Sequence, residues 1–204
     1  CAFPGKKSKI FYYIACAYYS NAYCRSSYGT VYRNSLRKGE HRLLTDEDYM
    51  REALSLAKEA FSMGEVPVGA VAVWDGKIVG RGMNRRETDK NALRHAEIAA
   101  IDEACKNLGG WRLWKCDLYV TLEPCPMCAG AIINSRIRRV IFGASDAKAG
   151  SCGSVTDMFS LPYNHKPEVV SGILERECSE LLTEFFTGLR EKRRGEKAQK
   201  CKEP

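Results

Sequence analysis

The sequence has no long apolar run and, over its first 39 residues, no acidic side chain. No segment approaches the roughly 18 consecutive apolar residues that a membrane-spanning helix needs, which excludes such a helix. The lack of acids gives residues 1–40 a net charge of +6; residues 185–204 carry +4, and residues 41–184 sum to −3. The basic character belongs to the two ends, so a nucleic-acid partner has to be argued from the basic C-terminus and local clusters rather than from the total charge.

The length of 204 residues fits one domain with tails, and 45% hydrophobic residues are enough for a core. Ten cysteines do not require disulfides in a chain this long. The metal site described below needs free thiolates, which predicts a reducing, cytoplasmic location.

Residues 1–43 differ in composition from the rest, and the chain begins with Cys instead of Met. Residues 10–19 (IFYYIACAYY), which follow three lysines, have the basic-then-apolar order of a signal peptide, and the lack of acids also fits a transit peptide. We favour a leader that is either non-native or disordered, with Lys38-Gly39-Glu40 as a translated ribosome-binding site. The expected organisation is then a leader over 1–43, one domain with a basic C-terminal helix over 44–200, and a tail over 201–204.

Hydrophobic spacing predicts helices that alternate with strands. Thr45 is expected to cap a first helix that ends at Gly64, and Asp75-Gly76 is expected to join two strands of a hairpin. The predicted strands are 68–74, 77–83, 118–121, 139–143 and 169–171; the other predicted helices run from 92 or 93 to 106, from Cys125 onward, and over 174–200. Helices between parallel strands indicate an α/β fold with three layers, α/β/α.

The chemistry is concentrated in His95-Ala96-Glu97 and Pro124-Cys125-Pro126-Met127-Cys128. Cys125 and Cys128 open a predicted helix, so both sulfurs lie on one face and can reach one ion. A helix N-terminus also favours the thiolate over the thiol. With His95 as third ligand, a tetrahedral zinc ion keeps one position for water, as catalytic zinc sites do.

Glu97 follows His95 by two residues, which is too close for a fourth ligand but suits proton transfer beside the metal. Two thiolates neutralise the charge of the ion, so the metal alone activates water only moderately. A carboxylate that takes the proton of water and returns it to the substrate contributes about 10²–10⁴-fold. H-x-E followed by P-C-x-x-C is the signature of zinc-dependent base deaminases.

The C-x-x-C has two other interpretations. A redox pair is disfavoured by the proline on each side of Cys125 and by the matching H-x-E. A closed structural zinc needs a fourth ligand, and Glu97 would then have no role. The candidates for that ligand, none of them spaced as a partner pair, are Cys105, Cys116 and Cys152.

Several further stretches resemble the bacterial tRNA wobble-adenosine deaminases of the cytidine-deaminase-like superfamily, over about residues 45–200. The resemblance implies a five-stranded mixed sheet with helices on both sides, and a homodimer whose tRNA site draws on both subunits. The chain departs from the family where Thr187-Gly188-Leu189 interrupts the basic run after Phe185-Phe186. Besides Phe185-Phe186, the stretches that carry the resemblance are Glu65-Val66-Pro67-Val68-Gly69-Ala70, Asn84-Arg85, Leu122-Glu123-Pro124-Cys125, Gly143-Ala144-Ser145-Asp146-Ala147-Lys148-Ala149-Gly150, Gly153-Ser154 and Asn164-His165.

The resemblance also implies roles for site residues. One zinc ion per subunit would bind His95, Cys125 and Cys128, with Glu97 as the catalytic proton shuttle. The substrate-binding residues would be Asn84 on the flipped-out nucleotide, Val66 in the base pocket, the Ala96 backbone N–H at the reacting centre, and Pro124. RNA contacts are expected at Lys148, Asp157, His165, Phe186 and Arg190.

Some of these assignments keep an alternative. His165 has a structural or solvent-facing role as the other interpretation, and at least one of Phe185 and Phe186 is expected in the core. A solvated basic face is expected at Arg136, Arg138 and Arg139 near the metal helix, with phosphate contact as the alternative.

The resulting hypothesis is hydrolytic deamination of adenosine to inosine at the wobble position (34) of a tRNA anticodon. The first alternative is a deaminase of a free nucleobase or nucleoside, of the cytosine or guanine type, which shares the metal ligands. The second is a non-catalytic tRNA-binding subunit. Such a subunit is expected to lack the shuttle carboxylate, whereas Glu97 is present.

Overall fold

A computed structural model describes residues 44–200, with side chains up to 196. The predicted leader 1–43 and tail 201–204 lie outside the described residues. The helices are α1 (Asp46–Ser62), α2 (Ala96–Leu108), α3 (Pro126–Ser135) and α4 (Glu175–Lys200), and the strands are β1 (Gly69–Trp74), β2 (Lys77–Met83), β3 (Cys116–Leu122), β4 (Arg139–Ala144) and β5 (Glu168–Ser171). The predicted strands are confirmed, with ends that differ by one or two residues.

The five strands form one sheet in the order β2-β1-β3-β4-β5. Strand β1 is antiparallel to β2 and to β3, whereas β3, β4 and β5 are parallel. The predicted five-stranded mixed sheet is therefore confirmed. Because only β1 is reversed, its amino end lies at the same end of the sheet as the carboxyl ends of the other four strands. We call this end of the sheet the carboxyl edge.

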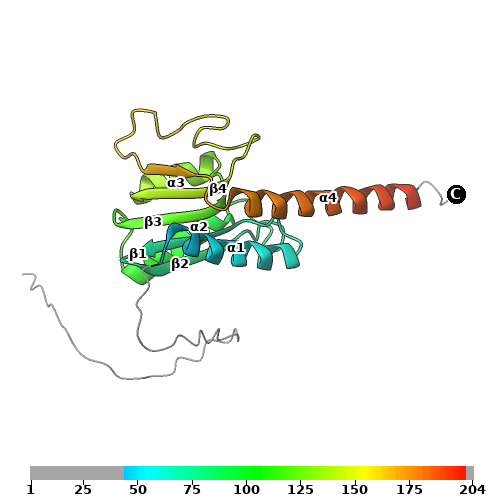
Figure 1. The fold of residues 1–204 in the computed structure, drawn as a ribbon, viewed down its shortest axis with the longest axis horizontal. Coiled ribbons are helices and arrows are strands. Elements are labelled where there is room, and N and C mark those ends of the chain that lie inside the picture. Colours follow the sequence, from blue (N-terminus) through cyan, green and yellow to red (C-terminus); the bar gives the residue numbers. More distant parts are fainter. Residues whose placement is uncertain (1–43, 201–204) are drawn as a thin grey trace, which may run out of the picture. The chain divides into compact units, whose positions relative to one another are not determined.

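Helices cover both faces of the sheet (Figure 1). Helices α1 and α4 pack on one face around Tyr119 and Ile141, and α2 and α3 pack on the other around Leu118 and Val140. Neighbouring residues of a strand thus enter opposite cores, as the two-residue period of a strand requires. Both faces are buried, which is usual for a sheet with parallel strands and gives the predicted three layers.

Helix α1 forms where the sequence predicts it. The Thr45 hydroxyl accepts the backbone N–H of Asp48 at 3.3 Å, and the Asp48 carboxylate accepts the Thr45 N–H at 2.8 Å. This reciprocal capping box satisfies N–H groups that a helix start otherwise leaves unpaired. Three acidic residues in the first turn, Asp46, Glu47 and Asp48, add to the effect by facing the positive end of the helix dipole.

The predicted start of the second helix at residue 92 or 93 is wrong, since α2 begins at Ala96. The side chain of Asn91 accepts the Leu93 N–H at 2.9 Å, and its carbonyl accepts the Arg94 N–H at 3.1 Å. This local turn competes with helix formation, as asparagine side chains commonly do. The later start matters for the site, because it places His95 at the N-cap position, where its side chain makes no capping hydrogen bond.

The start of α2 lies directly against the end of β2. A Cβ atom at Gly82 would collide with the Ala96 carbonyl oxygen, and one at Gly80 would collide with that of Ala100. Glycine at these positions lets the helix approach the strand more closely than any side chain would allow. The close approach holds the first turn of α2, with Glu97, at the carboxyl edge.

Helix α4 begins at Glu175, one residue after the predicted start at Leu174. Its first half packs on the sheet, and the Phe185 ring lies 5.5 Å from that of Phe61 in α1. The later part of the helix, orange to red in Figure 1, extends away from the sheet. None of the helices described for residues 44–200 is both long and apolar enough to cross a membrane.

Candidate active site

Two helix N-termini meet at the carboxyl edge. His95 is the N-cap of α2, and Cys125 is the N-cap of α3 directly after β3. Pro126 occupies the first helical position of α3, where a missing N–H costs nothing. In open α/β sheets this edge is where sites form, because loops and helix N-termini converge there.

The structure brings the three predicted ligands together. The Nδ1 atom of His95 lies 3.6 Å from the Sγ of Cys125 and 3.6 Å from the Sγ of Cys128, and all three atoms lie within 4.8 Å of one another. In a tetrahedral zinc site with Zn–S of about 2.3 Å and Zn–N of about 2.0 Å, a nitrogen and a sulfur ligand are about 3.5 Å apart. The donor set and its spacing therefore fit zinc.

Over residues 44–200, this triad is the single group of three or more His, Cys, Asp or Glu side chains close enough to hold a metal ion. Cys105, Cys116 and Cys152 do not join it. The closed structural zinc, which needs a fourth protein ligand, thus has no support among the described residues. An ion held by these three side chains would keep a fourth position for water or substrate, as in catalytic sites.

Glu97 is buried beside the triad, with 4% of its surface exposed. Burial, together with the negative charge of the Cys125 thiolate, raises the pKa of Glu97 to about 7. A carboxyl group with a pKa near neutrality both accepts and donates protons readily at physiological pH. A cation held by the triad would move this pKa down again, because it stabilises the carboxylate.

The Cys125 thiol is prepared for metal binding. Hydrogen bonds from the Cys128 thiol and the His95 imidazole lower the pKa of Cys125 to about 4 and outweigh its burial. At neutral pH, Cys125 is therefore a thiolate, the form that binds metals. The same hydrogen bond with Cys125 raises the pKa of His95, since the protonated imidazole is the better donor.

A pocket of about 220 Å³ opens beside Glu97. Three of the four predicted substrate-binding residues line it: Val66, Asn84 and Ala96. Pro124 does not line it; this residue is buried between β3 and α3, and its carbonyl accepts the Ser151 N–H at 2.9 Å. The remaining lining residues are Val68, Arg86, His95, Glu97, Leu122, Glu123, Cys125, Asp146 and Ala149.

Sequence reasoning did not assign Glu123, a carboxylate with 2% exposure that anchors the loop after β4. It accepts the backbone N–H groups of Asp146, Cys152 and Ser154 at 2.9–3.1 Å and the Ser154 hydroxyl. Gly150 packs so tightly on it that a Cβ atom would collide with the carboxylate. An acid directly after an apolar strand and two residues before a ligand was the available signal.

None of the five predicted RNA contacts lines the pocket. Lys148 is exposed on the pocket loop, between the lining residues Asp146 and Ala149. Asp157 is exposed, and its carboxylate accepts the Phe159 N–H at 3.0 Å.

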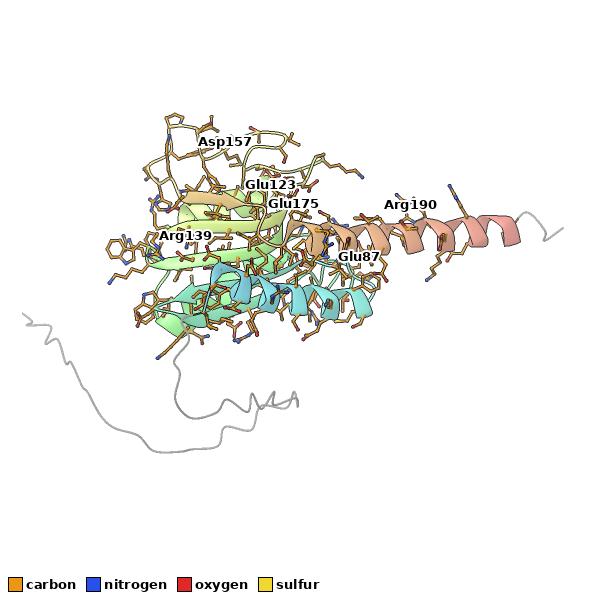
Figure 2. All side chains as sticks on the ribbon, in the orientation of Figure 1. Glu87, Glu123, Arg139, Asp157, Glu175 and Arg190 are labelled. Atoms are coloured by element: carbon orange, nitrogen blue, oxygen red, sulfur yellow. The ribbon has the colours of Figure 1, made fainter. Side chains whose placement is uncertain are left out.

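The other three lie on different elements. His165 has a structural partner, because its Nε2 lies 2.6 Å from the Ile137 carbonyl oxygen. Phe186 is 40% exposed. Its neighbour Phe185 is half-buried and contacts the Phe61 ring of α1, but it is not part of either buried core cluster of the described residues. Figure 2 shows Arg190 on the extending part of α4, far along the helix from Glu175 at its start.

Comparisons with known proteins agree with this site. Residues 44–190 match the family of MafB19-like deaminases. The tRNA-specific adenosine deaminase of Bacillus subtilis (strain 168) is 53% identical over 150 residues, which cover 73% of this chain and 93% of that protein.

Two solved structures are also similar. One, from a study of A-to-I editing by tRNA:A34 deaminases at the wobble position of transfer RNA, has 48% identity and a TM-score of 0.64, over 65% of this chain and 97% of the other. The guanine deaminase of Bacillus subtilis has 39% identity and a TM-score of 0.50, over 57% and 74%. The fold, the triad beside a buried acid and these relatives agree: the chain belongs to the family of tRNA-specific adenosine deaminases.

Proposed function

We infer that this protein converts adenosine to inosine at the wobble position of a tRNA anticodon. The observation that carries the inference is the triad of His95, Cys125 and Cys128 beside the buried Glu97, in a pocket of about 220 Å³. A pocket of this size suits a single base that has left the stack, which is how enzymes reach the reacting atom of a nucleotide. Relatives that act on tRNA support adenosine in RNA as the substrate.

We propose that the triad holds one Zn²⁺ ion per subunit. When bound, the ion would polarise a water molecule next to the base and lower the pKa of that water. The support is the donor set of two sulfurs and one imidazole and its 3.6 Å spacing.

The protein's own groups would carry the proton transfers. The carboxylate of Glu97 takes a proton from the attacking water as the water oxygen bonds to C6 of adenine. Glu97 then returns a proton to N6, the C6–N6 bond breaks, and ammonia leaves. Burial excludes bulk water from Glu97, so that the proton it has taken is delivered to the substrate.

Other pocket residues would bind and orient the base. Val66 and Val68, which line the pocket, would form an apolar wall, Asn84 would offer an amide to the edge of the base, and the Ala96 N–H would face the reacting centre. The anticodon loop is already single-stranded, so extrusion of its base costs less than extrusion from a duplex.

For the tRNA backbone we propose phosphate contacts by Lys148 near the pocket and by Arg190 on α4, since both side chains are basic and exposed. We also propose the homodimer that the family resemblance implies. A tRNA substrate would place the enzyme in the cytoplasm.

A free-base deaminase is the second candidate, because a guanine deaminase is among the similar structures. A non-catalytic tRNA-binding subunit is disfavoured by Glu97, whose burial beside the triad has no purpose in such a protein.

The deciding experiment incubates the zinc-loaded protein with an anticodon stem-loop that has adenosine at the wobble position, and separately with free adenosine, cytosine and guanine. We expect inosine in the stem-loop and little conversion of the free compounds. A stem-loop with the adenosine moved one position along the loop is the matched control. Conversion of the free compounds alone would contradict the proposal and favour the second candidate.

A further inference from the structure

Glu65, which follows α1 and precedes β1 in the chain, is a carboxylate with no exposed surface. It accepts a hydrogen bond from the side-chain Nδ2 of Asn84 at 3.2 Å and from the backbone N–H groups of Glu87 and Thr88 at 3.2 and 2.5 Å. Asn84 lines the pocket, whereas Glu65 does not. Glu65 therefore touches a substrate-facing residue from behind.

Glu65 is ionised at neutral pH. Burial alone would raise its pKa, but the hydrogen bonds from Thr88 and Glu87 and the nearby charge of Arg86 outweigh burial and lower the pKa of Glu65. An ionised carboxylate has acceptors only, and several donors already converge on it.

The ionised Glu65 carboxylate constrains the orientation of the Asn84 side-chain amide. If the amide turned by 180°, its Oδ1 would face the Glu65 carboxylate, and two acceptors without a proton between them repel. With Nδ2 held by Glu65, the amide oxygen and the second Nδ2 hydrogen are the atoms left for the pocket. The backbone of Asn84 is fixed as well, since its N–H donates to the Val68 carbonyl at 2.9 Å.

We propose that Glu65 is a positioning residue that locks the side-chain amide of Asn84 in one orientation and so sets which of its atoms read the base. The proposal rests on the proposed function, because Asn84 reads a base only if a base enters the pocket. Glu65 then has two roles. Its hydrogen bonds to Glu87 and Thr88 hold the loop after β2, and its hydrogen bond to Asn84 orients the amide that reads the base.

A double-mutant cycle tests the second role. Glu65→Gln keeps the size of the side chain but adds a donor, so either orientation of the Asn84 amide becomes acceptable. We expect Glu65→Gln to lower kcat/KM for the stem-loop about tenfold in the wild-type background, as expected for loss of a hydrogen bond to a charged group. In an Asn84→Ala background, the same change is expected to lower kcat/KM less than twofold, because the residue through which it acts is gone.

Glu123→Gln is the matched control. Glu123 is also a buried carboxylate that holds a pocket loop through backbone N–H groups, but its hydrogen bonds go to residues 146, 152 and 154 instead of Asn84. We expect it to reduce kcat/KM by the same factor in both backgrounds. Equal losses for Glu65→Gln in both backgrounds, or no loss in either, would overturn the positioning role.

The experiments distinguish failure of the proposed function from failure of the positioning role of Glu65. If the wild-type chain forms no inosine in the stem-loop, the proposed function fails and this inference fails with it. If the wild-type chain is active and the cycle is additive, only the inference fails.

A measurement without Glu65 variants covers the case in which Glu65→Gln does not fold. In a ¹H–¹⁵N spectrum of the wild-type chain, with the Asn84 side-chain signals identified by their loss in Asn84→Ala, we expect one amide hydrogen to be protected from solvent exchange. Equal, fast exchange of both amide hydrogens would overturn the proposal.

Discussion

Charged side chains lie at both ends of the sheet, but at one end they form ion pairs and at the other they surround the candidate metal position. At the end opposite the carboxyl edge, called the amino end here, the Arg138 guanidinium binds Asp117 through two hydrogen bonds of 2.7 and 2.8 Å, and Arg139 lies 3.2 Å from Asp117 and 2.9 Å from Asp46. The Tyr119 hydroxyl donates to Asp46 at 2.7 Å. Both of these acids, Asp46 and Asp117, have a guanidinium partner.

At the carboxyl edge, Glu97 and Cys128 are buried and Cys125 is half-buried, around a position that suits a cation. Burial, together with repulsion by the Cys125 thiolate, raises the pKa of Glu97 to about 7. An acid that is paired with a guanidinium group stays charged and helps to hold the fold. A buried ionisable group that lacks a partner of opposite charge has a shifted pKa, which is typical of reactive groups. Figure 2 shows the contrast: Arg139 lies at one end of the sheet and Glu123, next to the site, at the other.

The largest expected effect comes from Cys128→Ser at the carboxyl edge. We expect loss of bound zinc and of all detectable deamination. The Tm should fall by roughly 5 °C or more, because a metal bound only by the folded state contributes to stability and ~1 kcal/mol is about 2–4 °C for a domain of this size. The measurements are metal content by atomic emission, inosine formation and thermal unfolding. Cys105→Ser, at a half-buried thiol outside the triad, is the control that should keep metal and activity.

Glu97→Gln should separate chemistry from metal binding. We expect kcat to fall about 10²–10⁴-fold, because the amide transfers no proton. Zinc content and Tm should change little, since Glu97 is not one of the three ligand side chains. Single-turnover inosine formation measures the effect, and turnover at the wild-type rate would remove Glu97 from the mechanism.

At the amino end, Asp117→Asn should lower stability without affecting catalysis, the opposite of what is expected for Glu97→Gln. The substitution removes a charge that two guanidinium groups share, and we expect the free energy of unfolding to fall by about 2 kcal/mol with kcat/KM unchanged. Urea unfolding is the measurement. The matched control is Arg51→Met, which breaks the exposed Arg51–Glu47 pair at 3.7 Å and should cost less than about 0.5 kcal/mol. A drop in kcat/KM for Asp117→Asn would show that the two ends are not independent.

The elements and the two sulfurs of the triad could be predicted from the sequence, because both depend on local spacing. Apolar residues of α1 recur at helical intervals, and Cys125 and Cys128 lie one turn apart, so no distant contact has to be known. His95 is 30 residues from Cys125, and it was assigned from the H-x-E and P-C-x-x-C signature instead. Asn91 shows the limit of such reasoning. Its side chain ends the loop with a turn and delays α2, and composition alone does not distinguish this turn from a first helical turn.

What the sequence does not predict depends on partners far apart in the chain. Arg138 and Arg139 were expected as a solvated face near the metal helix, yet they lie at the amino end, where Arg139 pairs with Asp46, 93 residues away. Likewise Glu65 and Glu123 were noticed only within family-like stretches. Their roles follow from donors 19–31 residues further along the chain, at positions that only the folded sheet brings together.

The smallest expected effect is the pH dependence of the amino end. Burial raises the pKa of Asp46, but hydrogen bonds from Arg139 and Tyr119 outweigh burial, and the net pKa is lowered. A carboxyl group whose pKa is lower in the folded than in the unfolded state contributes stability above its unfolded pKa, and this stability is lost as the pH falls through the folded pKa. For Asp46 the loss therefore lies below about pH 4.

Asp46→Asn should consequently lower stability at pH 7, by less than about 1 kcal/mol since the site is partly exposed, and the difference from wild type should shrink at pH 3. Urea midpoints at the two pH values, with chelator present throughout so that zinc release does not contribute, measure it. Glu47→Gln in the same helical turn, whose pair with Arg51 is exposed, is the control. A difference for Asp46→Asn that stays constant from pH 7 to pH 3 would mean that Asp46 acts through shape and helix capping, so that the paired end of the sheet owes its stability to packing instead of charge.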